Sequence, residues 1–247
     1  MFSIDDRDRV HDRVLEMASI DPRVVAAAVV GGLAEGGGDR WSDLDLTFAV
    51  ADAVPLSEVL ADWTEEFAAE FDAAHLFDLP AGPSIYRVFL LPGCLQVDLS
   101  FTPAAAFGAR GPRFRLLFGN AVDLPQAPPP SANDLFGLGV HHAVRARFCI
   151  ERSRWWQAEY WISGVRDQAL ALACRRHGLA VAEGRGFDDL PADVLARLEE
   201  ALVRSLQPEE LRRALASAVS GLVRESAEAA DLAASVDTQL REISSTS

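Results

Sequence analysis

A proline-rich stretch, Leu124–Asn133, separates two parts of the chain whose apolar residues follow different periods. Its sequence, LPQAPPPSAN, concentrates proline and small polar residues, which excludes a helix interior or an inner strand there. Apolar residues before it alternate or form short continuous runs, whereas those after it recur at helical spacing. The pattern predicts an α/β (α+β) protein in which a mixed-sheet domain, about residues 1–123, precedes an α-helical bundle domain, about residues 131–247.

The two expected domains differ in their predicted elements. The first is predicted to contain helices over residues 5–18 and after Pro55, and strands at VVAAAVV (24–30), LDLTFAV (44–50), SIYRVFLL (84–91) and LQVDLSF (95–101). Pro92-Gly93-Cys94 separates the last two strands and predicts a hairpin turn. The short basic string ARGPRFR (109–115) is expected to be a loop or a helix cap. In the second domain, Pro191 and Pro208 precede amphipathic helical runs, and a last apolar run extends from Leu232 to Ile243.

Charge and composition restrict the partners. The net charge is −14, from 37 acidic and 23 basic residues, and every basic residue is arginine. This balance argues against nucleic acid, which requires a cationic surface, and favours a cationic small molecule. No apolar run is long enough for a membrane span and no signal peptide is recognised, so we expect a cytoplasmic protein without a membrane partner. The three cysteines are too scattered for a disulfide framework or a zinc site. The oligomeric state stays open.

The segment Val29–Leu46 combines a glycine-rich turn with an Asp-x-Asp strand. Gly31 and Gly32 allow backbone N–H groups to approach phosphate oxygens closely. Asp43 and Asp45 are two residues apart on a strand, so they point to the same face. Paired carboxylates on one rigid strand suit Mg²⁺, which prefers oxygen ligands and retains contacts to substrate phosphate.

A third carboxylate stands in a similar setting. In CLQVDLSF, apolar residues alternate with Gln96, Asp98 and Ser100, so Asp98 leaves the polar face of a strand whose other face is core. If this strand lies beside the first pair, three carboxylates converge. Such a cluster can hold a metal ion or accept a proton during phosphoryl-type transfer.

The glycine pair, ten intervening residues, Asp43-Leu44-Asp45 and the distal Asp98 resemble the polymerase-β-type nucleotidyltransferase superfamily. The preceding strand, the Ser42-Asp43 pair and the helical second half look most like the nucleotidyltransferases that modify aminoglycoside and lincosamide antibiotics. The resemblance covers residues 24–101. It implies a nucleotidyltransferase fold, Mg²⁺ as cofactor and a nucleoside triphosphate such as ATP as donor.

The resemblance also implies roles for individual residues. Asp43 and Asp45 would bind Mg²⁺, and Asp98 would be a third ligand or the general base. Gly31 and Gly32 would face the triphosphate, with Ser42 and Arg40 nearby. Many members have serine where this chain has Gly32, followed by arginine where it has Leu33. The departure leaves backbone N–H groups, and Arg40, to hold the phosphates.

A helical segment of the second domain offers candidate acceptor-binding residues. Trp155, Glu159 and Arg166 share one helical face, and Asp167 lies to its side. An aromatic ring could stack on a substrate, the carboxylates could bind amines and the arginine could bind phosphate. In the alternative, the tryptophans are bundle core and the charges pair with one another. The adjacent pair His141-His142 diverges by about 100° on a helix, which argues against a metal site.

The sequence therefore predicts an Mg²⁺-dependent enzyme that transfers a nucleoside monophosphate to a hydroxyl of a small, cationic, aminoglycoside-like acceptor. Two alternatives stay open. One is a nucleotidyltransferase that modifies protein, as in the antitoxin partners of small toxin systems. The other is a non-catalytic nucleotide-binding regulator that keeps the fold. The three acids argue against the regulator, whereas Gly32 and Leu33 favour it slightly.

Overall fold

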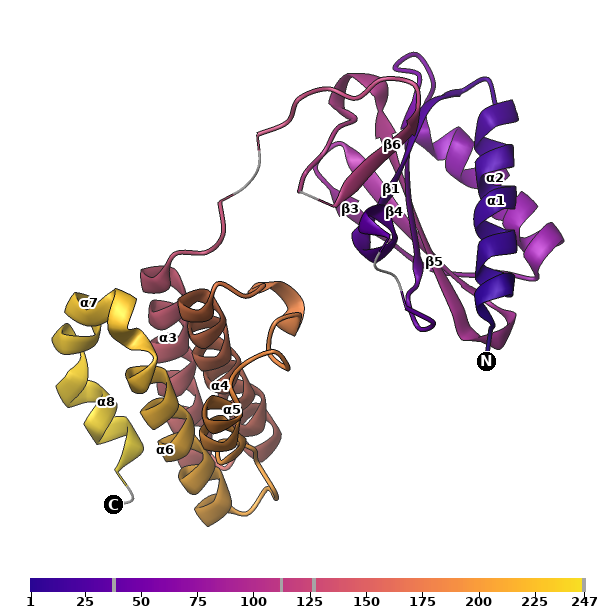
Figure 1. Ribbon diagram of the computed structural model, residues 1–247. Helices are drawn as coiled ribbons and strands as arrows, with labels where there is room; N and C mark the ends of the chain where they lie inside the picture. The colour runs from indigo at the N-terminus through magenta and orange to yellow at the C-terminus, as the bar shows by residue number, and fades with distance from the viewer. Residues whose placement is uncertain (37–38, 112, 126–127, 246–247) are drawn as a thin grey trace. The chain divides into compact units, whose positions relative to one another are not determined.

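The computed structural model describes residues 1–36, 39–111, 113–125 and 128–245. The chain forms two compact units, Met1–Ala127 and Pro128–Ser247, each with its own apolar core (Figure 1). The first unit contains a mixed sheet and the second is helical, which confirms the predicted fold class.

The sheet of the first unit has six strands in the order β3-β4-β5-β2-β1-β6. Strands β2 and β5 are parallel, and every other neighbouring pair is antiparallel. The bounds are β1 Val24–Val30, β2 Leu44–Val50, β3 Ala74–Ala81, β4 Ser84–Leu91, β5 Leu95–Pro103 and β6 Phe114–Phe118. The predicted hairpin is confirmed: β4 and β5 pair across the turn at Pro92–Cys94.

Two helices, α1 (Ile4–Ile20) and α2 (Leu56–Phe71), supply the apolar side chains that cover one face of the sheet. Trp63 of α2 lies at the centre of this core, with its ring centroid 5.0 Å from that of Phe48 and 5.1 Å from that of Phe101. Because side chains alternate along a strand, the neighbours of these core residues point to the opposite face of the sheet. The polar residues of β2 and β5 therefore gather away from the helices.

The opposite face is covered at one end by the segment that follows β5. Phe107 is buried there against Ala26, Ala28 and Ala49. The small side chains of these three alanines leave room for the phenylalanine ring. The Phe107 carbonyl also accepts a hydrogen bond of 2.8 Å from the backbone N–H of Val122, which ties the two ends of this segment together.

The sequence did not predict two strands, β3 and β6. Strand β3 is exposed over almost its whole length and contains Pro80, so it shows neither alternation nor a buried run. Strand β6 begins at Phe114, inside the basic string expected to be a loop or a helix cap. That expectation is wrong for its last two residues, because Phe114 and Arg115 pair with β1 at the edge of the sheet.

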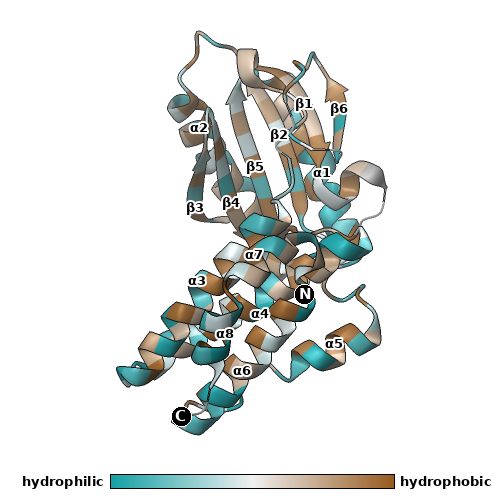
Figure 2. Ribbon diagram, turned by 90° about the vertical axis from the view of Figure 1, so that its left-hand side faces the viewer, coloured by the Kyte–Doolittle hydropathy of each residue, from teal (hydrophilic) through white to brown (hydrophobic). Residues whose placement is uncertain are grey.

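The second unit consists of helices packed around a small-residue core rich in alanine and leucine. Brown apolar and teal polar residues alternate along these helices (Figure 2). The bounds are α3 Ala132–Glu151, α4 Trp155–His177, α5 Ala192–Glu199, α6 Pro208–Arg224, α7 Ala230–Ser235 and α8 Asp237–Ser244. Helices α5 and α6 begin next to Pro191 and Pro208, as predicted. Among the described residues, no helix is both long and apolar enough to cross a bilayer.

The domain boundaries drawn from the sequence stay a prediction that proteolysis can test. Of the predicted linker, residues 124–133, the last two residues belong to α3. We expect a nonspecific protease to cut first in the part that precedes this helix, because a loop opens at less cost than a helix or a strand. Residues 126 and 127 lie outside the described residues. Mass spectrometry of early digestion products should give two fragments that resist further cleavage. Early cuts inside α3 or β5 would contradict the division.

Asp21, at the end of α1, links both helices of the first unit and predicts acid sensitivity. Burial opposes ionisation of Asp21, but hydrogen bonds from Arg23 and from Trp63 Nε1 outweigh it and lower the pKa of Asp21 to about 2. A lowered pKa stabilises the folded state above the ordinary aspartate pKa, and this stability is lost as the pH falls through the folded-state value.

We therefore expect Asp21 to contribute on the order of 2 kcal/mol to the unfolding free energy at neutral pH, lost between about pH 4 and pH 2. Urea unfolding of wild type and Asp21→Asn across this range measures the effect. The two curves should converge at acid pH. Parallel curves would show that the Asp21 carboxylate does not cause the acid response.

Candidate metal and nucleotide site

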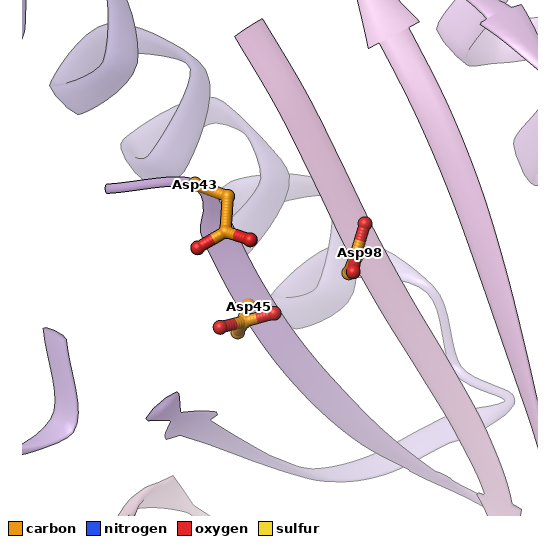
Figure 3. A group of neighbouring side chains, drawn as sticks. All are labelled: Asp43, Asp45 and Asp98. Carbon is orange, nitrogen blue, oxygen red and sulfur yellow. The ribbon is translucent and has the colours of Figure 1, made fainter. Parts of the chain in front are cut away.

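Three carboxylates converge on the polar face of the sheet, from two strands that are distant in sequence (Figure 3). Asp45 of β2 is the direct register partner of Asp98 on the parallel strand β5. Asp43 precedes β2 by one residue and alternates with Asp45. This register places Asp98 beside the Asp-x-Asp pair, as the predicted three-carboxylate cluster requires.

The donor set fits a magnesium ion. Each of the three aspartates offers a carboxylate oxygen, and these oxygens lie within 4.8 Å of one another. Oxygen ligands of an octahedral Mg²⁺ at about 2.1 Å are roughly 3–4 Å apart, so small side-chain rotations complete the arrangement. Three carboxylates this close repel one another unless a cation neutralises them. Asp43, Asp45 and Asp98 are therefore the residues that would hold the metal.

The surroundings of Asp98 shift its pKa, and they act in opposite directions. Its side chain is half-buried, and this burial raises its pKa above the ordinary value. The Gln96 amide opposes the shift by donating to both carboxylate oxygens, at 3.0 and 3.2 Å, whereas the negative charge of Asp43 adds to it. Gln96 lies on the same face of β5 as Asp98, and the sequence pattern alone assigns it no role. Its amide orients the Asp98 carboxylate.

The two glycines of the turn after β1 have different surroundings. Gly31 has a φ of +69°, and a Cβ built on it would lie 2.3 Å from Asp45 Oδ2. A Cβ on Gly32 would have no atom of the described residues within 4 Å, apart from its own chain neighbours. Only position 31 therefore requires glycine, because its backbone is left-handed and because a Cβ there would clash with the Asp45 carboxylate. The second position has room for the serine found there in the family that the motif resembles.

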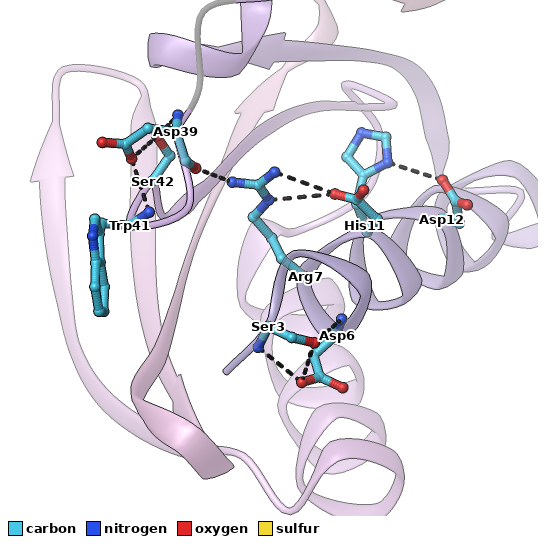
Figure 4. Close-up of polar contacts among 9 residues, drawn as sticks. Ser3, Asp6, Arg7, His11, Asp12, Asp39, Trp41 and Ser42 are labelled. Carbon is cyan, nitrogen blue, oxygen red and sulfur yellow. Dashed lines mark hydrogen bonds and ion pairs between the residues drawn. The ribbon is translucent and has the colours of Figure 1, made fainter. Parts of the chain in front are cut away.

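The loop that leads into Asp43 is held by its own side chains (Figure 4). Asp39 accepts a hydrogen bond of 2.8 Å from the backbone N–H of Trp41, and the Ser42 hydroxyl lies 3.1 Å from its Oδ1. The guanidinium of Arg40 lies 4.5 Å from the centre of the Trp41 ring. The Ser42 hydroxyl thus shapes the turn, and roles for Ser42 and Arg40 toward a nucleotide stay predictions.

The side chain of Arg7, on α1, forms a hydrogen bond with the backbone of this loop. Its side chain is only 7% exposed, and Nη1 donates a 2.6 Å hydrogen bond to the backbone carbonyl of Asp39. A buried guanidinium needs such acceptors, since an unpaired buried charge is costly. Arg7 is a positioning residue that the sequence analysis missed. Thirty-two residues separate it from its partner, and no local pattern reveals a contact of that range.

The candidate acceptor-binding residues of the second unit all lie on α4. Trp155 is half-buried and packs against the helical core, and Ser163 donates a 2.8 Å hydrogen bond to Glu159 Oε1. Arg166 forms an ion pair of 2.8 Å with Asp167. These contacts agree with the alternative of core tryptophans and paired charges at Trp155, Arg166 and Asp167. That alternative is wrong for Trp156, which is 77% exposed. A role for the four residues in acceptor binding stays a prediction.

The neighbouring histidines form an aromatic group. The rings of His141 and His142 are 5.9 Å apart, and both lie against Trp161, with the His142 ring centroid 5.1 Å from that of Trp161. Burial lowers the pKa of His142 below its ordinary value. The pair therefore packs with Trp161.

Comparisons with known proteins give matches among solved structures alone. No family model matches the sequence, and no curated protein matches it. The structure is similar to the crystal structure of an aminoglycoside 6-adenyltransferase from Bacillus subtilis, with a TM-score of 0.41 and 13% sequence identity, over 98% of this chain and 99% of that chain.

Proposed function

We propose that the chain is an Mg²⁺-dependent nucleotidyltransferase that transfers a nucleoside monophosphate from a nucleoside triphosphate to a hydroxyl of a small molecule. The observation that carries the proposal is the register pairing of Asp45 with Asp98, which brings three carboxylates together beside Gly31. The similarity to the adenyltransferase structure is too low to support any substrate.

The three acids would serve two purposes, metal binding and proton transfer. Asp43 and Asp45, with Asp98, would hold magnesium, which neutralises phosphate charge when bound. The acceptor oxygen attacks the α-phosphorus, the bond from that phosphorus to the bridging oxygen breaks, and pyrophosphate leaves. Asp98 accepts the proton of the acceptor hydroxyl. Its carboxylate suits this role because the Gln96 amide holds it in a fixed orientation on the strand.

We further propose a cationic acceptor such as an amino sugar. The chain carries a net charge of −14, and the site itself concentrates three carboxylates. Ammonium groups of the acceptor would offset negative charge that a metal ion alone does not neutralise. Ion pairs of this kind are partly exposed, so salt should weaken acceptor binding over a screening length of about 8–10 Å.

A pyrophosphate-release assay with magnesium tests both parts. The donor is each of the four common nucleoside triphosphates, and the acceptor panel contains aminoglycosides, lincosamides, a neutral sugar and a sugar phosphate. We expect release only with magnesium and an acceptor, fastest with a cationic one. The assay would reject the assignment if Asp45→Asn released pyrophosphate at the wild-type rate. A neutral or anionic best acceptor would reject the cationic class alone.

A further inference from the structure

A small pocket lies on the same face of the sheet as the three aspartates, one step further along the strands. Its volume is about 150 Å³, which is room for about five water molecules. Thr47 and Ser100 form its near wall, and each stands two residues beyond an acid of the site, roughly 7 Å along the strand. Ser84, Tyr86 and Thr102 continue this wall on β4 and β5, and the segment around Phe107 closes the other side.

The pocket wall is built from buried hydroxyl pairs. Ser100 lies 2.7 Å from Thr47, and Thr102 lies 2.7 Å from Ser84, oxygen to oxygen. All four of these residues are less than 9% exposed. Each pair contains two hydroxyl hydrogens but uses only one between its members. Neither pair has a further acceptor among the described residues, so each presents one hydrogen that a ligand oxygen can accept.

The covering segment adds positive charge. Residues 104–122 contain three arginines and no acidic residue, in a chain that has 37 acidic residues in total. Arg110 and Arg113 line the pocket, and Arg110 Nη2 lies 3.5 Å from Ser84 Oγ. Arg115 belongs to the same basic string but does not line the pocket. The hydroxyl groups of one wall thus face the Arg110 guanidinium, and Arg113 also belongs to the lining.

We propose that this pocket binds the phosphate group of a small ligand, through the hydroxyl hydrogens of the two pairs and the guanidinium of Arg110. A phosphate has five heavy atoms, all of its outer atoms are acceptors, and guanidinium matches it in charge and shape. The site is distinct from the metal-binding acids and does not depend on the proposed activity. The phosphate can come from free inorganic phosphate or from a phosphomonoester.

Calorimetric titration with inorganic phosphate, without magnesium or nucleotide, tests the site. We expect binding to wild type that Arg110→Gln weakens about tenfold, since it removes a charge-assisted hydrogen bond. Arg115→Gln is the matched control and should bind as wild type. Ser84→Ala should weaken binding severalfold, and thermal unfolding shows whether each variant is folded. Arg110 is exposed, so its replacement should leave folding intact.

Other ligands and one further variant separate the alternatives. Glycerol 3-phosphate that binds more tightly than phosphate identifies a phosphomonoester as the ligand, whereas equal or weaker binding identifies free phosphate. Asp45→Asn should bind phosphate as well as wild type or better, because a nearby negative charge is removed. Equal phosphate binding by Arg110→Gln and wild type would overturn the proposal. It would also be overturned by equal losses in Arg110→Gln and Arg115→Gln, or by glycerol that binds as well as phosphate.

Discussion

Asp45→Asn is expected to lower nucleotidyl transfer by about 10²-fold or more at saturating magnesium. Asp45 is in register with Asp98, and its Oδ2 lies 2.3 Å from the position that a Cβ on Gly31 would occupy. Asparagine keeps the shape of the side chain but removes one of three charges that neutralise the metal. Asp43→Asn should have a similar effect for the same reason. Pyrophosphate release under single-acceptor conditions measures the loss.

Thermal unfolding provides a second readout that does not require a known acceptor. Magnesium should raise the unfolding temperature of wild type, because a ligand that binds only the folded state stabilises it, and should raise that of Asp45→Asn much less. Without magnesium the variant should be as stable as wild type or more so, since like charges are relieved. Asp12→Asn is a suitable control, because the Asp12 side chain is 82% exposed on α1. An equal magnesium response in wild type and Asp45→Asn would remove Asp45 from the site.

Gly31→Ala is expected to reduce transfer by about 10- to 100-fold, whereas Gly32→Ala should remain within about twofold of wild type. The added Cβ at position 31 would lie 2.3 Å from Asp45 Oδ2, so the carboxylate must move from its present position. The left-handed backbone adds about 1 kcal/mol of strain for a residue other than glycine. At position 32 the Cβ meets no atom of the described residues within 4 Å, chain neighbours apart, so alanine introduces no clash with them.

The two glycine variants control for each other, since they make the same chemical change at adjacent positions. Gly32→Ala should slightly increase stability, by less than about 1 kcal/mol, because alanine restricts the unfolded chain more than glycine. The comparison needs steady-state rates and unfolding temperatures for both proteins. Equal activity in the two variants would show that the contact with Asp45 does not govern the chemistry.

Much of the first unit could be predicted from the sequence, because its inner strands carry strong local patterns. The buried run of β1 and the alternation in β2 and β5 identified both the strands and the face on which the acids lie. Strands at the edge of the sheet carry weaker patterns. Strand β3 is exposed and interrupted by Pro80, so nothing in its sequence distinguishes it from a loop.

The site was predictable to the extent that its residues lie on patterned strands. The sequence singles out Asp43, Asp45 and Asp98 as candidates, but only the structure shows that β2 pairs in parallel with β5 and so brings their carboxylates together. Residues that act through distant contacts were not identifiable. Arg7 reaches a backbone carbonyl 32 residues away, and the role of Gln96 depends on its side-chain rotamer rather than on residue type.

Two residues near the start of the chain, Phe2 and Arg7, contact the two segments that lead into the strands with the acids. The backbone N–H of Phe2 donates a 2.8 Å hydrogen bond to the carbonyl of Gly93, in the turn that leads into the Asp98 strand. Five residues later, Arg7 holds Asp39 in the loop that leads into Asp43. Both contacts join α1 or the residues before it to segments that are distant in sequence, so both require α1 to be packed in its final place. The acids therefore reach their final separation only when α1 docks, and the site should open and unfold together with that helix as one cooperative unit.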